Sequence, residues 1–519
     1  MVHDDKALHT PVLIAGGGPV GLALAALLAR LGVRSRVIEQ DGGYCSGSRA
    51  ICLSRRSLEI LGWAGAAEAV QAKGLGWTRG RSHFREREVL AFDMPHAPGD
   101  RFAPMTNIQQ FYVEEYLHRA MAAWPGMAEV HWATAVEAVD AQPQGVAVQC
   151  RTPEGTQRFT ADWLVACDGG RSTVREQLGL ALEGTTYEGR YVIVDIRQKS
   201  VRPTERLAWF DPPSNPGSTV LMHRQPDDVW RIDYQLREDE DPQAAVLPQN
   251  VLPRVRAHLE WMGEREPWEP LWISIYNAKC LSLARYRHGR VLFAGDAAHL
   301  VPIFGVRGLN SGLDDAGNLA WKLAAAVGGS AADALLDTYD TERRAAALLN
   351  IEFGSRSTEF MAPPHRGFAL MREAVLRLAA AEPAIRHLIN PRQSAPVPYP
   401  ATRLTGTDEG LPHDQGAPGR VAPEARAWLQ GRQRHLTELF GAGWVLLGFG
   451  PLPAVEGVQA VALDPHDGRN GEALERYGAC PGSAWLVRPD GYVAARWREA
   501  PGAAALQACL RRMSYHAHH

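Results

Sequence analysis

The chain has 519 residues, of which 45% are hydrophobic and 22% charged, and its formal net charge at pH 7 is −3. Such a chain forms two or three globular domains, which excludes a small binding module and wholesale disorder. The nearly balanced charge provides no basic field for a polyphosphate backbone, so we expect no nucleic-acid partner.

The cysteine pattern and the N-terminal region indicate in which cellular compartment the protein is found. The seven cysteines are scattered without Cys-x-x-Cys spacing, which is typical of reduced thiols rather than of disulfides or a metal site. The first apolar run, residues 20–29, ends at Arg30 and is shorter than the roughly 20 residues of a membrane span. We expect a cytoplasmic protein with no metal and no membrane association.

The first elements in the chain form a strand–helix–strand unit. An apolar strand is predicted over residues 12–15, a helix over 19–31 and a second strand over 35–39. A connection of this kind joins parallel strands in a sheet that is covered on both faces. The pattern therefore predicts an α/β domain with a parallel sheet.

Glycines in the first turn indicate a nucleotide site. Gly16, Gly18 and Gly21 form a G-x-G-x-x-G set between the strand and the helix, and Glu39 ends the second strand. The glycines allow a tight turn and close backbone approach, the helix N-terminus favours a pyrophosphate, and the acid accepts ribose hydroxyls. We expect FAD or NAD rather than NADP in this site; a plain tight turn is the alternative.

The middle of the chain has a different pattern. Strand-like segments over residues 218–224, 229–236 and 272–279 are separated by Pro, Asp and Gly clusters, which predicts a mainly antiparallel sheet. The α/β pattern then returns at Val291, so the first domain is discontinuous. The expected parts are a FAD-binding domain (1–181 and 286–390), an inserted β-sheet substrate domain (182–285), a Pro-rich connector (391–423) and a C-terminal α/β domain (424–519).

A second polar cluster follows the strand at residues 291–294. Asp296 at the strand end can accept another ribose hydroxyl, and Pro302 stiffens the loop that follows. Gly308, Leu309 and Asn310 enter a helix whose amides and positive dipole end favour an anionic group such as the pyrimidine edge of a reduced flavin. A plain glycine loop is again the alternative.

Three motifs together carry a family resemblance. They are Gly16–Gly21, the Asp-Gly motif over residues 167–175, and the Gly-Asp motif over residues 295–299. With them the chain resembles the FAD-dependent aromatic hydroxylases of the para-hydroxybenzoate hydroxylase fold. It is most similar to members that resemble 3-(3-hydroxyphenyl)propionate hydroxylase and carry a C-terminal thioredoxin-like domain. The resemblance implies a Rossmann-like FAD-binding domain with an inserted substrate sheet.

The resemblance also implies roles for individual residues. Glu39 would bind the FAD ribose, Arg49 the pyrophosphate, and Gln110 the flavin side of the cofactor. Asp168 would serve both FAD and the approach of the nicotinamide, and Pro302 would lie near flavin C4a. The full set of implied cofactor residues is Gly16, Gly18, Gly21, Glu39, Arg49, Gln110, Val136, Asp168, Asp296, Gly308, Leu309 and Asn310.

The activity implied is that of a monooxygenase. Such an enzyme uses NADPH or NADH and dioxygen to hydroxylate a small phenolic ring through a flavin C4a-hydroperoxide. One alternative is a flavin reductase of a polyketide or isoprenoid that inserts no oxygen, and another is a flavin-bound scaffold. The C-terminal domain is expected to be structural or to form the contact of a homodimer.

Residues of the inserted sheet supply the substrate candidates. Strand alternation places Tyr234 on one face and Arg231 with Asp233 on the other, where these two charges could simply pair with each other. A Tyr or His near the phenol could draw off its proton. The expected catalytic residues are Tyr234, His223, Tyr276 and Pro302, and the expected substrate-binding residues are Arg224, Arg231 and Arg307, although each single residue could also be structural.

Overall fold

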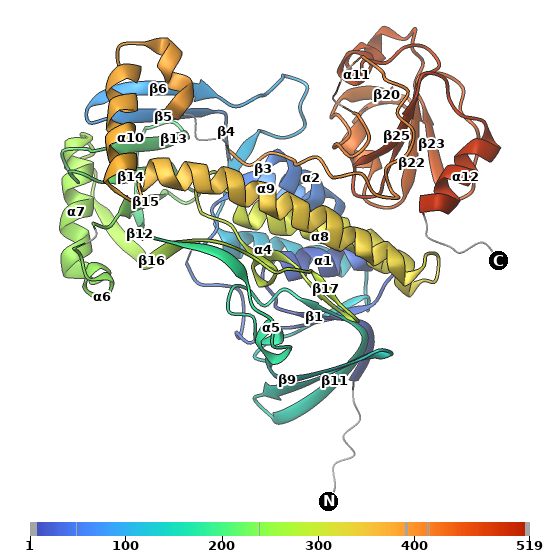
Figure 1. Cartoon of the computed structure of the whole chain (residues 1–519), viewed down its shortest axis with the longest axis horizontal. Helices are drawn as coiled ribbons and strands as arrows, with labels where there is room; N and C mark the ends of the chain where they lie inside the picture. The colour runs from blue at the N-terminus through green and yellow to red at the C-terminus, as the bar shows by residue number, and fades with distance from the viewer. Residues whose placement is uncertain are drawn as a thin grey trace, which may run out of the picture.

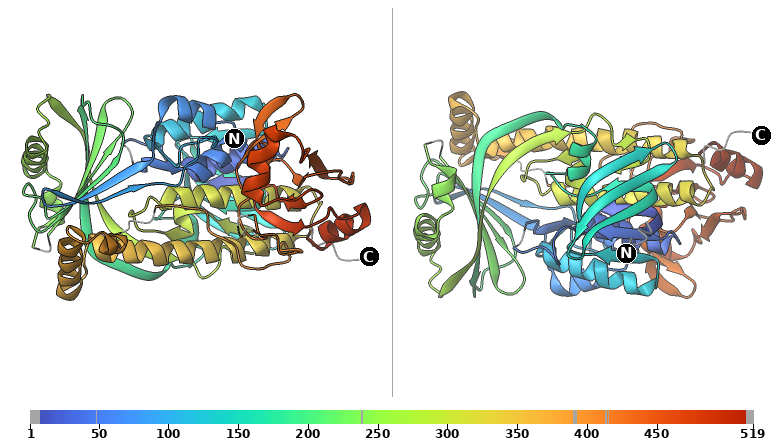
Figure 2. Two further views of the ribbon diagram at one scale, coloured as in Figure 1. Left: turned by 90° about the horizontal axis from the view of Figure 1, so that it is seen from above. Right: turned by 90° about the horizontal axis from the view of Figure 1, so that it is seen from below.

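The computed structural model describes residues 8–47, 49–237, 239–389, 393–412, 414 and 416–513. Two large sheets and a smaller C-terminal unit make up the molecule (Figure 1). The inserted sheet and the C-terminal unit lie at opposite ends (Figure 2). None of the described helices has the length and apolar character needed to cross a membrane.

The first sheet has eight strands. The chain enters it at β1, leaves it for long stretches, and returns to it at β18, as expected from the returning α/β pattern. Strands β1, β2, β8, β11 and β18 all run parallel. The order is β17 (Arg287–His288), β18 (Val291–Phe293), β11 (Gly155–Ala166), β1 (Leu8–Ala15), β2 (Ser35–Ile38) and β8 (Ala128–His131). In addition, β10 (Gly145–Thr152) pairs with β11, and β9 (Ala135–Gln142) pairs with β10.

Helices cover this sheet because a parallel sheet buries both faces. Helix α1 is apolar on all sides and packs against α4 and α8, so its residues 21–29 are fully buried. The helices of this part are α1 (Pro19–Arg30), α4 (Gln110–Ala120), α5 (Thr173–Gln177), α8 (Gly308–Val327) and the long α9 (Asp337–Met361).

The second sheet also has eight strands and is mainly antiparallel. Its order is β19 (His299–Leu300), β16 (Trp268–Ser282), β12 (Glu183–Gln198), β15 (Val229–Gln235), β14 (Thr219–Arg224), β13 (Arg206–Phe210), β5 (Arg79–Phe84) and β6 (Arg87–Asp93). One difference from the sequence analysis concerns residues 79–93, which were expected in the FAD-binding domain. They join the inserted sheet because β5 pairs in parallel with β13.

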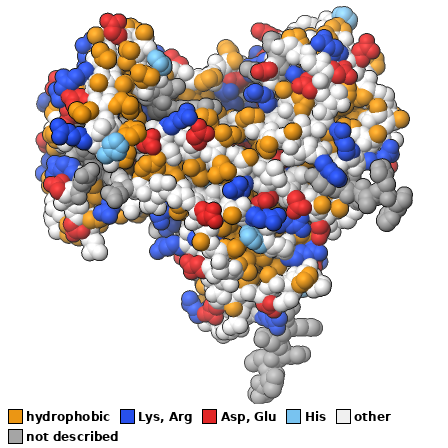
Figure 3. All heavy atoms as spheres, in the orientation of Figure 1, with side chains coloured by type: hydrophobic (Ala, Val, Ile, Leu, Met, Phe, Trp, Pro, Cys, Tyr) orange, Lys and Arg blue, Asp and Glu red, His pale blue; other side chains and the backbone are white. Residues whose placement is uncertain are grey.

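Helices α6 (Pro242–Ala245) and α7 (Pro248–Trp261) cover one face of the second sheet. A small sheet of β3 (Cys52–Ser54), β7 (Met105–Asn107) and β4 (Leu75–Trp77), with helices α2 (Arg55–Trp63) and α3 (Ala67–Lys73), meets the second sheet at the end of β14, where Asn107 donates to the Arg224 carbonyl (2.8 Å). Helix α10 (Arg366–Ala379) exposes Leu370, Met371 and Leu378, and Figure 3 shows hydrophobic side chains gathered over this helix.

The C-terminal unit contains a four-stranded mixed sheet. Its order is β23 (Val458–Ala462), β22 (Trp444–Gly448), β24 (Ala484–Val487) and β25 (Val493–Trp497), with β20 (Arg426–Leu429), β21 (Arg432–His435), α11 (Gly471–Tyr477) and α12 (Ala503–Met513) beside it. The expected α/β character is present, and β24 and β25 form a hairpin, whereas the thioredoxin-like assignment stays a prediction. In the connector, Tyr399 stacks on Tyr492 with ring centroids 3.9 Å apart.

Candidate active site

The register of the first sheet brings the motifs to one edge. Ala15 lies opposite both Ile38 and Ala166, and Ala166 lies opposite Phe293. Because these strands are parallel, all four end at the same level of the sheet. The glycine turn, Glu39, the Asp-Gly motif and the Gly-Asp motif each begin within one or two residues of these positions. They therefore converge on one edge, the position where open α/β sheets bind ligands.

The three glycines of the turn have two different functions. A Cβ atom on Gly16 would lie 2.3 Å from the carbonyl oxygen of Cys167, and one on Gly21 would lie 2.0 Å from the Gly16 oxygen. These two glycines are needed for close packing of the turn. Gly18 is the N-cap of α1, and a Cβ there would meet no atom within 4 Å. The space beside Gly18 is therefore available to a ligand.

Glu39 lies against this turn. Its carboxylate accepts hydrogen bonds from the backbone N–H groups of Gly17 (2.6 Å) and Asp41 (2.9 Å). Its carbonyl accepts from Thr134 (2.7 Å), two residues before Val136 in β9. The structure thus brings Glu39 and the β9 segment to the same side of the turn.

Gln110 holds the loop that contains Arg49. The Gln110 side-chain oxygen accepts from the Ala50 N–H (3.1 Å), and its nitrogen donates to Glu114 (2.8 Å). Arg49 itself is exposed, and its carbonyl accepts from the Arg231 guanidinium of the inserted sheet (2.9 Å). This loop therefore bridges the two large sheets.

Arg175 connects the Asp-Gly and Gly-Asp motifs. It donates to the carbonyls of Gly170 (2.7 Å) and Ala297 (3.0 Å). Asp168 accepts from the Val174 N–H (3.0 Å), while its second oxygen is buried without a hydrogen-bond partner among the described residues. Burial raises the pKa of Asp168. The sequence analysis did not predict this structural role of Arg175, although the residue lies within the Asp-Gly motif.

Asp315 of α8 fixes the position of the Gly-Asp motif. This fully buried carboxylate accepts from the Gly295 N–H (2.9 Å), pairs with His299 (2.7 Å) and accepts from Arg343 (2.7 Å). Burial acts to raise the pKa of Asp315, but His299 and Arg343 together hold it below its usual value. His299 thus has a structural role in this network.

A sequence signal for Asp315 existed. Ser311, Asp315, Asn318 and Lys322 recur at helical spacing and form a buried polar stripe on α8.

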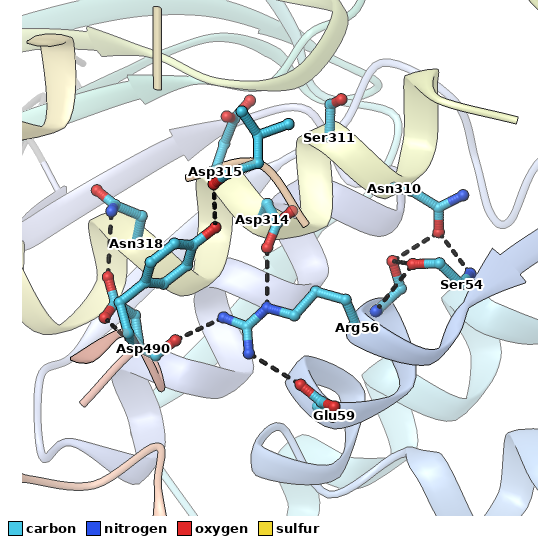
Figure 4. A network of polar contacts seen from close by, with 12 residues as sticks. Ser54, Arg56, Glu59, Asn310, Ser311, Asp314, Asp315, Asn318 and Asp490 are labelled. Atoms are coloured by element: carbon cyan, nitrogen blue, oxygen red, sulfur yellow. Dashed lines mark hydrogen bonds and ion pairs between the residues drawn. The ribbon is translucent and has the colours of Figure 1, made fainter. Parts of the chain in front are cut away.

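The N-terminus of α8 faces the same edge. No described side chain caps it, and a Cβ on Gly308 would meet no atom within 4 Å. The Asn310 side chain is instead committed to the protein, because it accepts from the Ser54 N–H (2.8 Å) and the Ser57 hydroxyl (2.6 Å) (Figure 4). The backbone of residues 308–310, rather than the Asn310 amide, is therefore the part that can meet a ligand.

The loop between Pro302 and Arg307 packs into the protein. Pro302 is buried against α9, where a Cβ on Gly354 would lie 2.9 Å from the proline ring. Arg307 is only 1% exposed, donates to Asn350 (3.3 Å) and lies over the Phe353 ring. Its guanidinium lies against α9, and the substrate-binding role of Arg307 stays a prediction.

The two faces of the inserted sheet have different surroundings. The outer face packs on α7, where Tyr234 belongs to a hydrophobic cluster with Val251 and Val255. Arg224 shares this face: it donates to the Arg202 carbonyl and lies over the ring of Trp230, another member of the outer cluster. Two predictions are thus corrected, because strand alternation points Tyr234 and Arg224 away from the motif edge.

Part of the inner face packs against the end of α9 and against α10, and Arg231 on this face reaches the Arg49 loop of the motif edge. The inner face carries a row of residues in which each lies directly opposite the next: Trp272, Asp195, Arg231, His223 and Arg206. Arg231 pairs with Asp195 (3.1 Å) as well as with the Arg49 carbonyl. The sequence analysis named Arg231 and His223 but missed Asp195 and Arg206, for which the sequence contained no distinguishing pattern.

Two further residues belong to the inner face. The Tyr276 hydroxyl donates to the Val301 carbonyl (3.4 Å), and nearby Asp296 adds to the effect of burial in raising the Tyr276 pKa. Asp233 is 7% exposed, and one of its oxygens has no hydrogen-bond partner in the described part of the chain. Burial raises the pKa of Asp233 to about 7, with Arg231 acting in the opposite direction.

The turn between β24 and β25 in the C-terminal unit contacts helices α8 and α9 next to this site (Figure 4). Arg488 forms a bidentate ion pair with Glu342 of α9 (2.7 and 2.8 Å), and Lys322 of α8 binds the same carboxylate (2.7 Å). Asp490 accepts from Asn318 (3.1 Å). Since Arg343, which holds Asp315, follows Glu342 in the chain, the C-terminal unit contacts the helices that support the Gly-Asp motif.

These residues fit an FAD molecule. The open surface at Gly18, the unpartnered Asp168 oxygen and the uncapped start of α8 supply a phosphate site, a hydrogen-bond acceptor and backbone donors along one edge. Sheet register, rather than neighbourhood in the sequence, brings them together.

Comparisons with known proteins agree with this arrangement. The FAD binding domain family matches residues 9–353, and the family of aromatic-ring hydroxylase C-terminal domains matches residues 415–515. The chain is 31% identical over 389 residues to a 3-(3-hydroxy-phenyl)propionate/3-hydroxycinnamic acid hydroxylase of Mycolicibacterium smegmatis. That match covers 75% of this chain and 67% of the relative.

Solved structures show the same fold over nearly the whole chain. The aklavinone-11 hydroxylase, solved with FAD and aklavinone, has a TM-score of 0.78 at 25% identity and covers 99% of this chain and 100% of that one. The anhydrotetracycline hydroxylase OxyS from Streptomyces rimosus has a TM-score of 0.75 at 28% identity, with 98% and 100% covered. The chain therefore belongs to the FAD-dependent aromatic hydroxylases and is a flavoprotein monooxygenase.

Proposed function

We propose that this hydroxylase acts on a small phenolic ring held between the inner face of the inserted sheet and the loop of residues 302–307. The observation that carries the proposal is the row of polar side chains on the inner face, joined to the cofactor edge through Arg231 and the Arg49 carbonyl. The relative from M. smegmatis, named for phenolic acids, supports a single-ring substrate. Reduction of a polyketide or isoprenoid without oxygen insertion is not supported by these hydroxylase relatives.

The FAD would lie along the motif edge. The turn at Gly18 would meet the pyrophosphate together with Arg49, and Glu39 would meet the ribose beside the β9 segment of Val136. Asp168 and Asp296 would contact the middle of the cofactor, and the backbone of residues 308–310 its pyrimidine edge. When bound, FAD supplies the two-electron chemistry that links NAD(P)H oxidation to dioxygen.

Asp233 is the residue best placed to accept the phenol proton. A phenol ring becomes more nucleophilic when its hydroxyl proton is withdrawn, and a base near neutral pKa does this efficiently. The pKa of Asp233 is about 7, and its free oxygen lies on the inner face. His223 is a weaker candidate, because burial and two arginines lower its pKa to about 3. Tyr276 already donates to a backbone carbonyl.

The protein also excludes water from the reaction. Phe304 packs edge-on against Tyr191 of the inner face, with ring centroids 5.1 Å apart, and both rings are buried. Pro302 closes the neighbouring position against α9. A dry, closed site of this kind limits side reactions of the reduced cofactor.

Product analysis tests the proposed function. The purified protein should be yellow, should oxidise NADH or NADPH faster when a phenol is added, and should place one labelled oxygen atom from ¹⁸O₂ in the product. Stimulated NAD(P)H oxidation without labelled product, for every phenol in a panel, would contradict it. Asp233→Asn should slow hydroxylation of ordinary phenols about 100-fold, within the usual range for loss of a general base, and should be rescued by a phenol already ionised at the assay pH.

The sequence also predicts a homodimer and a cytoplasmic location. Light scattering on the purified holoenzyme tests the first, and cell fractionation tests the second.

A further inference from the structure

Helix α10 exposes apolar side chains to solvent. Leu370, Met371 and Leu378 are 57%, 49% and 52% exposed, whereas Leu376 of the same helix is only 1% exposed. Leu388, shortly after the helix, is 50% exposed. Figure 3 shows hydrophobic side chains gathered over this segment. Large exposed apolar patches of this kind mark interaction surfaces.

The exposed residues have the spacing of a helix–helix contact. They recur at alternating steps of four and three residues: Gly367, Met371, Ala374, Leu378 and Ala381. This spacing keeps them on one side of a helix and is the pattern by which two helices pack along each other. The other side of α10 is used within the chain, since Leu376 and Ala379 pack in one cluster with Tyr191 and Phe304.

This exposed stripe, residues 366–382, is nearly symmetrical about Ala374. Leu370 and Leu378 lie four residues before and after Ala374, and Arg366 and Glu382 lie eight residues before and after it. A two-fold symmetric contact pairs each residue with its counterpart in the other copy. In an antiparallel pair of α10 helices, Leu370 of each copy would therefore lie against Leu378 of the other, and Arg366 against Glu382. The small Ala374 side chains would meet at the axis.

The charges at the ends of the stripe fit such a pair. Arg366 and Glu382 are both exposed, and neither forms an ion pair within the described part of the chain. They are about 24 Å apart along the helix and cannot pair within one copy. An amphipathic helix that binds an anionic membrane has a mainly basic polar face. Here Glu373 and Glu382 balance Arg366 and Arg377 on the exposed side.

We propose that α10 is the contact surface of a symmetric homodimer, in which the α10 helices of two copies pack antiparallel about Ala374. The contact lies beside the inserted sheet, at the end of the molecule away from the C-terminal unit (Figure 2). The 14-residue helix is about 21 Å long. Such a pair buries less than the roughly 800 Å² per partner of a standard interface, so we expect a reversible dimer with a micromolar Kd. This proposal concerns assembly and does not rest on the proposed function.

Sedimentation velocity of the FAD-loaded enzyme tests the dimer. As the protein concentration rises from about 0.5 to about 200 µM, the mass should increase from that of one chain to that of two. Leu378→Glu should raise the dimer Kd at least 10-fold, because it places an unpaired charge in the apolar contact. Its melting temperature should stay near the wild-type value, since the side chain is half exposed. The control is Leu247→Glu, which is 43% exposed and lies directly before α7, and it should keep the wild-type Kd.

Exchange of the end charges tests the antiparallel register. Arg366→Glu and Glu382→Arg each place like charges opposite each other at both ends of the pair. Each should raise the dimer Kd about 3- to 10-fold, the range expected for two exposed ion pairs. The double variant should return to within about 2-fold of the wild type, because each new charge again faces its opposite. Since the two residues cannot meet within one copy, only contact between copies explains such a rescue.

Cross-linking locates the two-fold axis. Ala374→Cys should form a covalent dimer when the thiol-specific oxidant diamide is added, because the two new thiols lie next to each other; diamide takes up the two protons and two electrons. Ala381→Cys is the matched control on the same stripe. Its two copies would be about 20 Å apart, too far for a disulfide. Ala381→Cys should therefore not exceed the wild-type background, to which exposed Cys480 contributes.

Three results would overturn the proposal: a monomer at every concentration, equal effects of Leu378→Glu and Leu247→Glu on the Kd, or equal cross-linking of Ala374→Cys and Ala381→Cys. If Leu378→Glu does not fold, the charge exchange and the cross-linking still decide. Binding of a monomer to phosphatidylglycerol–phosphatidylcholine vesicles that is lost in Leu378→Glu would assign the stripe to a membrane and would also refute the homodimer. Hydroxylation of a phenol by a strictly monomeric enzyme would refute this inference and leave the proposed function intact.

Discussion

Gly18→Ala separates cofactor binding from folding. Gly18 has φ −73° and ψ −178°, which any residue adopts, and a Cβ there meets no protein atom within 4 Å. The loss of a good N-cap and the gain from a less flexible unfolded chain are each within about 1 kcal/mol and oppose each other. We therefore expect the melting temperature of the apoprotein to change little.

The same methyl group should weaken FAD binding strongly. If the pyrophosphate lies against this turn, the methyl displaces it and removes a charged hydrogen bond worth about 1.5–3 kcal/mol. This corresponds to a Kd about 10- to 150-fold higher, measured by quenching of flavin fluorescence on titration into apoprotein. Gly443→Ala is the control, since its site is equally open but lies in the C-terminal unit. A wild-type Kd for Gly18→Ala, or a loss that only follows a lower melting temperature, would refute the reasoning.

Three further predictions follow from buried groups. Glu342→Gln removes the carboxylate that Arg488 (2.7 and 2.8 Å) and Lys322 (2.7 Å) share. Arg488 keeps its ion pair with Asp490, but no other described carboxylate forms an ion pair with Lys322, so leaving this buried cation unpaired should cost about 3–5 kcal/mol in urea unfolding; a loss under about 1 kcal/mol would contradict this. Asp315→Asn weakens the hold on the Gly295 N–H, so the Kd of FAD should rise more than about 10-fold, an estimate from the loss of one charged hydrogen bond; an unchanged Kd would count against this role. Burial lowers the pKa of His258 to about 3, so the folded protein keeps it neutral while the unfolded chain binds a proton below about pH 6.5. His258 should therefore contribute a fall of about 1.4 kcal/mol per pH unit as the pH drops from 6.5 toward 3, and His258→Gln should remove that part of the slope in urea unfolding followed by circular dichroism; parallel curves would refute the assignment.

The cofactor motifs were readable from the sequence because each is local. A glycine turn, its helix and an acid at the next strand end lie within about one supersecondary unit, so spacing alone predicts them. The residues that support the site from distant parts of the chain could not be predicted in this way. Asp315 holds Gly295 from a helix twenty residues later, and Arg175 reaches Ala297 from a different motif.

The substrate candidates show most clearly what the sequence alone could not predict. Alternation correctly separated Tyr234 from Arg231, because successive strand residues point to opposite faces. It could not say which face meets the cofactor, since this depends on α7 covering the outer face. For this reason Tyr234 and Arg224 were wrong candidates, and Arg206 was missed.

The amino-acid sequence alone determined the cofactor class, the order of the motifs and the interrupted α/β pattern, because these depend on neighbouring residues and their spacing. Only the tertiary structure decided which polar side chains face the substrate and which serve as internal supports. That decision depends on strand register and on helices packed from distant parts of the chain. Among the described residues, no carboxylate forms an ion pair with the buried Arg206, whereas Arg231 pairs with Asp195 and Arg343 with Asp315.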